Sequence, residues 1–155
     1  FVVRLLVFGS RSWIDVQPGS TLEEAQRQLR RGHAIKGPLY RAIYQAVSDT
    51  MRIDGWVTLI EGEAVGADLL AREAAWHLEQ RVERFPVTKS LDGDWPAAGH
   101  RRNARMHRDG KPDRAIGFVS GKVGTPLSRG SAGMLAICKR AGTPVVVYRE
   151  DGVES

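Results

Sequence analysis

Five short runs of aliphatic and β-branched residues recur along the chain, with helical patterns between them. The runs occupy residues 2–8, 56–60, 82–85, 114–119 and 144–148. Several are almost continuously apolar, as is typical of strands covered on both faces. Because strands and helices alternate, we expect βαβ units with right-handed crossovers. The pattern predicts an α/β, Rossmann-like, doubly wound and mostly parallel five-stranded sheet in the order 3-2-1-4-5, with helices on both faces.

Apolar residues three and four positions apart predict the helices. The four main helices are expected within residues 38–51, 67–78, 100–108 and 131–140. Another is expected at about residues 21–31, where Thr21-Leu-Glu-Glu24 is typical of a capping box. We interpret residues 14–37 as an insertion into a single domain that spans residues 1–149. Residues 150–155 are expected to form a frayed tail.

The composition is that of a globular chain with a basic balance. Of 155 residues, 42% are hydrophobic and 26% are charged, and the formal net charge is +5. The single cysteine, Cys138, excludes a disulfide framework within the chain and favours a buried structural thiol in a cytoplasmic protein. No apolar run approaches the roughly 20 residues that span a bilayer, so we expect no membrane contact. The spacing of His, Cys and Asp predicts no metal site.

Glycine-containing loops follow three of the predicted strands. We name residues 9–13 loop one, residues 61–68 loop two and residues 120–125 loop three. Glycine lets a backbone approach an anion closely, and N–H groups at a following helix start supply donors. Since parallel strands end at the same edge of a sheet, we expect the loops to converge on one electropositive pocket between the first and fourth strands.

Loops one and three carry side chains that suit a phosphate. Ser10 and Ser12 offer hydroxyl groups, and Arg11 can bind a phosphate through two hydrogen bonds. Loop three has the pattern Gly-x-x-Gly-Thr, and residues 128–131 lead from it into the last helix. Without a ligand-binding role, loop one would be an ordinary βα turn and loop three a flexible surface loop.

Loop two carries carboxylates instead. Glu61 and Glu63 follow the second strand, where they could hydrogen-bond ribose hydroxyls, although a solvated position is an equal interpretation for Glu63. Gly66 and Ala67 open the next helix. Asp68 lies in its first turn, where a negative charge suits the helix dipole, and this favours a structural role.

A basic cluster precedes the fourth strand. Arg102 and Met106 share one helical face, and the methionine predicts that Arg102 points inward. A buried arginine needs an anionic partner, which could be Glu61 or a ligand phosphate. Asn103 adds amide donors beside it.

Five motifs recur in order through nearly the whole chain, at residues 9–11, 61–68, 98–106, 110–113 and 121–125. Together they resemble the SLOG superfamily, in particular its YspA-type branch of bacteria and phages. That branch is related to LOG-type (lysine decarboxylase-like) phosphoribohydrolases and to DprA-type domains. The resemblance implies a Rossmann-like domain that binds a nucleotide or nucleotide-derived ligand. It also implies a pocket lined by Gly9, Ser10, Arg11, Gly62, Gly66, Arg102, Asn103, Gly121, Gly124 and Thr125.

The chain departs from the catalytic motif of the LOG-type enzymes, which cleave nucleoside monophosphates between the base and ribose 5′-phosphate. Those enzymes carry Pro-Gly-Gly-x-Gly-Thr-x-x-Glu after the fourth strand, whereas this chain has Ser120-Gly121-Lys122 in place of Pro-Gly-Gly. The position of the glutamate falls on Ser128 or Gly133, neither of which can stabilise positive charge developing on the ribose. We therefore expect binding or sensing of the ligand without strong catalysis.

Two alternatives stay open. The first is a nucleoside 5′-monophosphate phosphoribohydrolase, with Arg102 and either Glu61 or Glu63 as catalytic candidates. The second is single-stranded nucleic-acid binding, which is less consistent with the sequence because the tryptophans are not interleaved with arginines; only Trp13 and Trp95 fall in loops near the crevice.

The expected partner is a nucleotide-derived small molecule, and a homodimer is compatible with the resemblance. No cofactor beyond that ligand is indicated. The full set of expected ligand-binding residues is Gly9, Ser10, Arg11, Gly62, Gly66, Ala67, Asp68, Arg102, Asn103, Ser120, Gly121, Gly124, Thr125 and Ser131.

Overall fold

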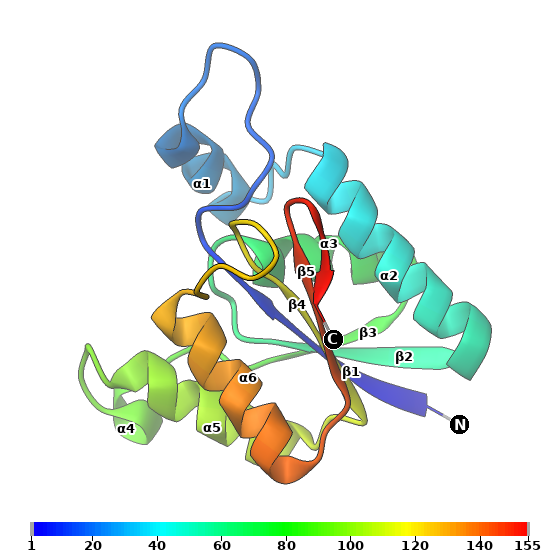
Figure 1. Cartoon of the computed structure of the whole chain (residues 1–155), viewed down its shortest axis with the longest axis vertical. Helices are drawn as coiled ribbons and strands as arrows, with labels where there is room; N and C mark the ends of the chain where they lie inside the picture. Colours follow the sequence, from blue (N-terminus) through cyan, green and yellow to red (C-terminus); the bar gives the residue numbers. More distant parts are fainter. Residues whose placement is uncertain (1, 155) are drawn as a thin grey trace.

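The computed structural model describes residues 2–154, which form a six-stranded sheet with helices on both faces (Figure 1). The strand order is β3-β2-β1-β4-β5-β6, in which β1 to β5 run parallel and β6 is antiparallel to β5. The strands are β1 (Val2–Gly9), β2 (Trp56–Glu61), β3 (Arg81–Arg84), β4 (Arg114–Phe118), β5 (Val145–Arg149) and β6 (Gly152–Glu154). The predicted Rossmann-like fold and the order 3-2-1-4-5 are confirmed, with one strand more than expected.

The helices pack as two layers. They are α1 (Leu22–Arg30), α2 (Pro38–Asp54), α3 (Ala67–His77), α4 (Lys89–Asp92), α5 (Ala98–Gly110) and α6 (Arg129–Ala141). α1, α2 and α3 share one core cluster with the sheet, and α5 and α6 share the other. Five of these helices match the predictions, and the single turn α4 was not predicted. Within residues 2–154, no helix is both long enough and apolar enough to cross a lipid bilayer.

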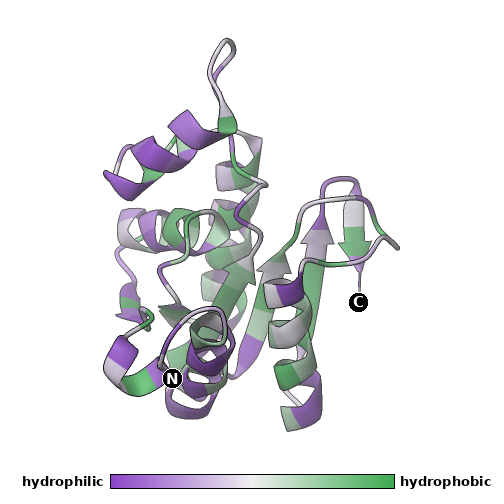
Figure 2. Ribbon diagram, turned by 90° about the vertical axis from the view of Figure 1, so that its left-hand side faces the viewer, coloured by the Kyte–Doolittle hydropathy of each residue, from purple (hydrophilic) through white to green (hydrophobic). Residues whose placement is uncertain are grey.

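The central strand β1 shows why both faces of the sheet need cover. Leu5 and Val7 pack into the core cluster of α2 and α3, whereas Leu6 and Phe8 pack into that of α5 and α6. All four side chains are at most 5% exposed. Successive side chains of a strand point to opposite faces, so a continuously apolar strand must be covered twice. Figure 2 shows the hydrophobic strands between helices whose outward surfaces are hydrophilic.

The segment that we interpret as an insertion is docked on the rest of the fold. Ala25 and Leu29 of α1 are buried in the core cluster that includes α3. Thr21 is the N-cap of α1, and its hydroxyl accepts a hydrogen bond from the Glu24 N–H at 3.1 Å. The Asp15 carboxylate accepts hydrogen bonds from three N–H groups at the start of α2. This carboxylate supplies the cap that the glycine at the N-cap of α2 cannot provide.

The C-terminal segment forms a hairpin, which corrects the expectation of a frayed tail. β6 pairs with β5, and the Arg149 side chain between the strands and loop three is fully buried. Arg149 donates to three carbonyl oxygens of residues 119–125 and pairs with Glu154 at 2.9 Å. Arg149 pairs with Gly152, so Glu150 and Asp151 form the two-residue turn of the hairpin.

Candidate functional site

A cavity of about 490 Å³ opens at the carboxyl edge of the sheet, between loop one and the first turn of α6. It lies where the strand order reverses, between β1 and β4, which is where doubly wound sheets bind their ligands. Seven of the residues predicted to bind ligand line it: Gly9, Ser10, Arg11, Asp68, Arg102, Asn103 and Ser131. The cavity lining does not include the other seven, which are Gly62, Gly66, Ala67, Ser120, Gly121, Gly124 and Thr125.

The glycines of loops one and two serve contacts between backbones. A Cβ on Gly66 would lie 2.4 Å from the Ser10 carbonyl oxygen, and the φ of Gly66 is +120°. A Cβ on Gly9 would lie 2.2 Å from the carbonyl oxygen of Phe118. No side chain fits at such distances, so glycine is required at both positions for the loops to pack. Ala67 is 1% exposed beneath this contact.

Loop three joins the same edge of the sheet through Ser10. The Ser10 hydroxyl accepts a hydrogen bond from the Ser120 N–H at 3.0 Å and lies 3.2 Å from the Ser120 hydroxyl. The Ser120 carbonyl and the Thr125 hydroxyl are both bound by Arg149. The three loops therefore meet at one edge, as the sequence predicts, but loop three faces the hairpin and not the cavity.

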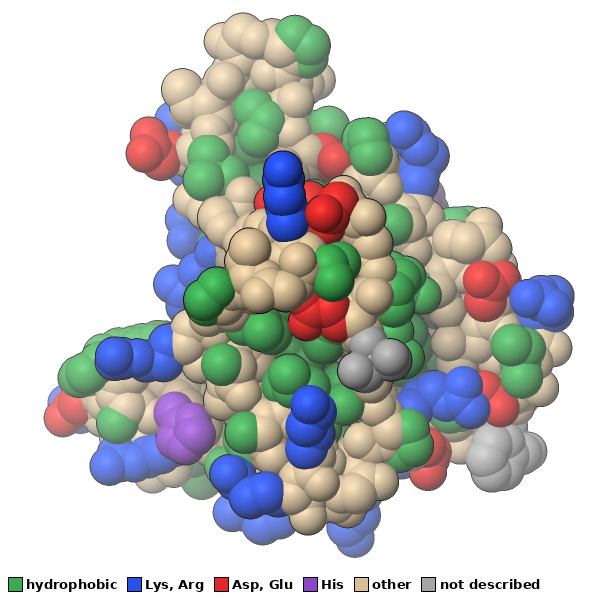
Figure 3. Space-filling view, in the orientation of Figure 1, with side chains coloured by type: hydrophobic (Ala, Val, Ile, Leu, Met, Phe, Trp, Pro, Cys, Tyr) green, Lys and Arg blue, Asp and Glu red, His purple; other side chains and the backbone are tan. Residues whose placement is uncertain are grey.

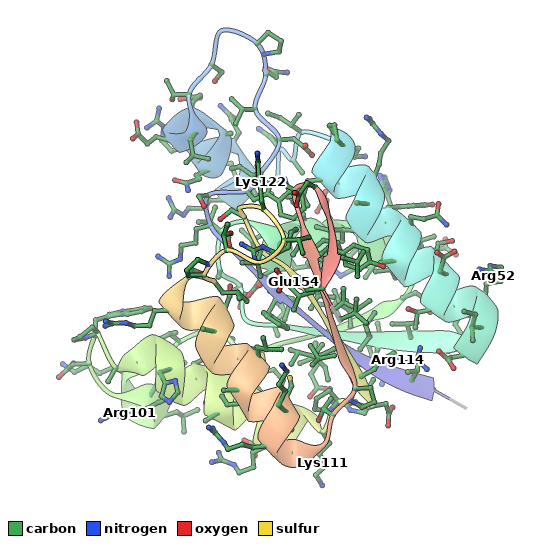
Figure 4. The ribbon with its side chains drawn as sticks, viewed as in Figure 1. Arg52, Arg101, Lys111, Arg114, Lys122 and Glu154 are labelled. Carbon is green, nitrogen blue, oxygen red and sulfur yellow. The ribbon has the colours of Figure 1, made fainter. Side chains whose placement is uncertain are left out.

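Carboxylates of the β5–β6 hairpin occupy the N–H groups of loop three (Figure 4). The donor and acceptor pairs are Gly121 with Glu150 at 2.5 Å, Val123 with Asp151 at 2.8 Å, and Gly124 with Glu154 at 2.7 Å. Figure 3 shows acidic side chains gathered over this end of the molecule. Loop three is thus an anion-binding loop, but the anions that it binds belong to the protein. This is why the structure does not bring the Gly-x-x-Gly-Thr motif to the cavity.

The first turn of α6 takes the place of loop three in the cavity wall. Ser128, Arg129, Gly130 and Ser131 all line the cavity. The Ser128 side chain makes no capping hydrogen bond, and within residues 2–154 no other side chain accepts one from the first N–H groups of α6. Ser131 is 4% exposed, yet its hydroxyl forms no hydrogen bond within the described residues and is not fully enclosed. Sequence reasoning noted this segment as the entry to a helix but assigned only Ser131 to the site.

Arg102 is the buried cation of the cavity. Its side chain is 7% exposed, and it points inward as its spacing from Met106 predicts. Nη1 donates to the carbonyl oxygens of Gly62 and Phe85, and Nε donates to Asn103 Oδ1 at 3.0 Å. A Cβ on Gly62 would lie 2.6 Å from Nη1, so loop two needs a glycine there. Nη2 makes no hydrogen bond to residues 2–154 and is not fully enclosed, which leaves a donor for a ligand.

Asp68 is the carboxylate that lines the cavity. Its Oδ2 accepts hydrogen bonds from the N–H groups of Gly62 at 3.0 Å and Ala64 at 3.2 Å, which shapes loop two. Its Oδ1 has no hydrogen-bond partner in the described part of the chain and is not fully enclosed. Burial raises the pKa of Asp68 to about 6, and the nearby Arg102 guanidinium opposes that rise. Asp68 therefore has a structural role and also offers one oxygen to a ligand.

Glu61 and Glu63 do not line the cavity, although the sequence made both of them catalytic candidates. Glu61 is fully buried; its Oε1 accepts a hydrogen bond from the Glu63 N–H, and its Oε2 has no hydrogen-bond partner among residues 2–154. Burial, reinforced by the charge of Asp68, raises the pKa of Glu61 to about 8. Glu63 pairs with Arg72 of α3 at 3.4 Å. Glu61 is fully buried and Glu63 is turned toward Arg72 of α3, so the structure places neither in the cavity lining.

Apolar side chains complete the cavity lining. Phe8, Met106 and Met134 line it and are at most 5% exposed. Trp95, in the segment between α4 and α5, also lines the cavity and is 61% exposed. The sequence placed Trp95 near the crevice but assigned none of the other three to the site. The positions of two of them could have indicated that they line the cavity, because Phe8 precedes the last residue of β1 and Met134 lies near the start of α6.

The remaining chemistry-bearing side chains lie elsewhere. Among residues 2–154, no three His, Cys, Asp or Glu side chains are placed together to hold a metal ion. Cys138, predicted to be a buried structural residue, is fully buried in α6, and burial raises the pKa of its thiol to about 11. His107 hydrogen-bonds Thr143 at 2.8 Å, outside the cavity.

Comparisons with known proteins add one structural likeness. No family model matches the chain, and no curated protein matches it. The X-ray structure of DNA processing protein A (DprA) from Streptococcus pneumoniae is similar to it, with 14% identity and a TM-score of 0.39. The likeness covers 93% of this chain and 58% of that one, so this chain spans less than two thirds of the other's length. The fold assignment rests on the strand order itself.

Proposed function

We propose that the cavity binds a nucleotide or nucleotide-derived ligand, as the YspA-type SLOG motifs imply, and that it does so without strong catalysis. The supporting observation is a set of donors that have no partner within the described part of the chain and that lie in one cavity at the switch point of the sheet. These donors are Arg102 Nη2, the Ser131 hydroxyl and the first N–H groups of α6. A guanidinium and a helix N-terminus are both suited to phosphate.

The rest of the cavity suits the remainder of a nucleotide. Its volume of about 490 Å³ lies within the range of small-molecule sites. The unpaired Oδ1 of Asp68 can accept a hydrogen bond from a ribose hydroxyl, and the amide nitrogen of Asn103 can donate one. An acceptor beside several donors matches a ligand that carries both hydroxyl groups and a phosphate.

Calorimetric titration of the protein with AMP, cyclic AMP and ADP-ribose tests this proposal. Ser131→Ala removes a hydroxyl that makes no hydrogen bond among residues 2–154, so the melting temperature should not change. Loss of one ligand hydrogen bond should weaken binding about 2- to 10-fold, because such a bond is worth about 0.5–1.5 kcal/mol.

Thr125→Ala is the matched control. Its hydroxyl accepts a hydrogen bond from Arg149 at 2.7 Å and lies outside the cavity lining. This variant should melt at a lower temperature and bind the ligand with unchanged affinity. The proposal is refuted if the wild-type protein binds none of the three ligands at millimolar concentration. It is also refuted if Thr125→Ala loses more affinity than Ser131→Ala.

Hydrolysis of nucleoside monophosphates is the second candidate function, and the position of Asp68 favours it. Asp68 lines the cavity beside Arg102, and its pKa of about 6 would let it hold a proton for a leaving base near neutral pH. Incubation with AMP, CMP and GMP, followed by chromatography for free base, tests this function. Release of base that Asp68→Asn abolishes and Glu61→Gln retains would establish hydrolysis with Asp68 in the role considered for Glu61 and Glu63.

Nucleic acid is not the partner that we propose, because the basic cluster of α5 is paired within the fold. Arg105 binds the Asp92 carboxylate through Nε and Nη2, at 3.0 and 2.9 Å. Arg101 donates to the Asp92 carbonyl, and Arg108 pairs with Asp109 at 2.9 Å. Carboxylates thus compensate the charges of Arg105 and Arg108, which weakens the attraction of this cluster for a phosphate backbone. A homodimer and a cytoplasmic location stay predictions from the sequence.

A further inference from the structure

Trp95 is a feature of the cavity that phosphate binding does not explain. Its side chain is 61% exposed although it is one of the largest apolar groups in the chain. Trp76 is exposed as well, but the Arg72 guanidinium lies over its ring at 5.0 Å. Trp95 has no aromatic or cationic partner of this kind among residues 2–154. A large ring left unpaired at the mouth of a cavity is typical of a ligand-contacting residue.

The ring of Trp95 lies against the first turn of α5. A Cβ on Gly99 would lie 3.1 Å from Cζ3 and 3.5 Å from Cη2 of the indole ring. Glycine at position 99 therefore lets the ring approach α5 closely, and a larger residue there would displace the ring slightly. The rest of the side chain is exposed, so an aromatic surface is open to a ligand.

Apolar side chains of the same cavity do not contribute to the binding of a phosphate or a ribose. Phe8, Met106 and Met134 are almost completely buried and line the cavity together with Trp95. Hydrated groups such as phosphate gain nothing from contact with them. A flat aromatic ring does gain, and methionine adapts its shape to such a ring.

We propose that Trp95 stacks on the base of the bound nucleotide, so that the site takes base-bearing ligands and discriminates against sugar phosphates that lack a base. This inference rests on the proposed function and adds the base to the groups that the cavity recognises. Every base has a π-face, so stacking tolerates different bases. Trp95 thus accounts for recognition of a nucleotide as a class and not for a choice among bases.

Calorimetric titration of the whole chain with AMP and with ribose 5-phosphate tests the inference. AMP should bind at least 5-fold more tightly than ribose 5-phosphate. Trp95→Ala should weaken AMP binding about 5- to 150-fold, the range for one base stacked on an aromatic residue, and change ribose 5-phosphate binding by less than about 2-fold. Trp95→Phe should retain most of the AMP affinity. Trp76→Ala, which removes an exposed tryptophan of α3 outside the cavity lining, should change neither affinity.

Tryptophan fluorescence provides a second readout. AMP should quench part of the emission of the wild-type protein and of Trp76→Ala, and the quenching should disappear in Trp95→Ala. Ribose 5-phosphate binding as tightly as AMP would overturn the stacking inference and leave the proposed function standing. Equal losses for both compounds in Trp95→Ala, or no loss for either, would also overturn it. Failure of both compounds to bind the wild-type protein would overturn this inference, whereas the proposed function falls only if cyclic AMP and ADP-ribose also fail to bind.

Discussion

Replacing Glu61 by glutamine is expected to stabilise the protein in neutral and alkaline solution. Glu61 is fully buried, and its Oε2 has no hydrogen-bond partner within residues 2–154. Burial raises the pKa of this carboxyl from 4.5 to about 8, and the charge of Asp68 adds to the rise. Between these two pH values the native protein holds a proton that the unfolded chain has released. The free energy of unfolding therefore falls as pH rises from about 4.5 to about 8, and levels off above that range.

The size of this loss follows from the same two values. A pKa difference of about 3.5, at about 1.36 kcal/mol for each pH unit, corresponds to at most about 5 kcal/mol. Glutamine has nearly the same shape and cannot ionise, so Glu61→Gln should avoid the loss. Asp68, whose pKa is raised from 3.8 to about 6, should leave the variant with a smaller decline over that lower range.

Urea denaturation of the wild-type protein and of Glu61→Gln at about pH 5, 7 and 9 measures the effect. The two proteins should have similar free energies of unfolding near pH 5, and the variant should be the more stable by several kcal/mol near pH 9. Glu83→Gln is the control, because Glu83 is a partly exposed carboxylate on the neighbouring strand β3 that pairs with Arg4. A pH dependence of Glu61→Gln that equals that of the wild-type protein would refute the reasoning.

Three further predictions concern the loops and the cavity. Glu154→Gln should lower the free energy of unfolding by about 1–3 kcal/mol in urea denaturation, because it weakens the partner of the fully buried Arg149 side chain; unchanged stability would contradict the role of the hairpin. In thermal melts, Gly66→Ala should lower the free energy of unfolding by about 1–3 kcal/mol or more, because the φ of Gly66 is +120°. Gly130→Ala should be neutral or stabilising in the same melts, because within residues 2–154 no atom lies close to the position of the added Cβ. Cyclic AMP, whose phosphodiester does not titrate near neutrality, should bind more tightly as pH falls through about 6, because protonation of Asp68 removes a negative charge from the cavity; Asp68→Asn should abolish this trend in calorimetry.

The fold could be predicted because four of the five parallel strands, β1, β2, β4 and β5, carry enough apolar residues to be recognised alone. β3 has only Val82, and it was recognised as the short run 82–85 between two helical patterns. β6 could not be predicted, because it has three residues and Val153 is the only large apolar one among them. Its stability comes from pairing with β5 and from the contacts of Arg149, which are tertiary. α4 has four residues, which is too short for a helical period to show.

Half of the site could be predicted from the rule that parallel strands end at one edge. The sequence could not show that loop three binds carboxylates of the hairpin, since each of those hydrogen bonds joins residues 28 to 30 positions apart. The sequence could not show, for a different reason, that Glu61 lies outside the cavity lining. Val57 to Glu61 are all buried in β2, so alternation along the strand gives no sign of which side chains face the crevice.

The structure of the protein crystallised with AMP tests the central claim most directly. The account predicts density for the nucleotide in the cavity, with the phosphate in hydrogen-bond contact with the Ser131 hydroxyl, the first N–H groups of α6 and Arg102 Nη2. It also predicts that the hairpin carboxylates stay on the N–H groups of loop three. A phosphate bound to the N–H groups of Gly121 and Gly124, with the hairpin displaced, would contradict the account, as would a cavity without nucleotide at millimolar AMP.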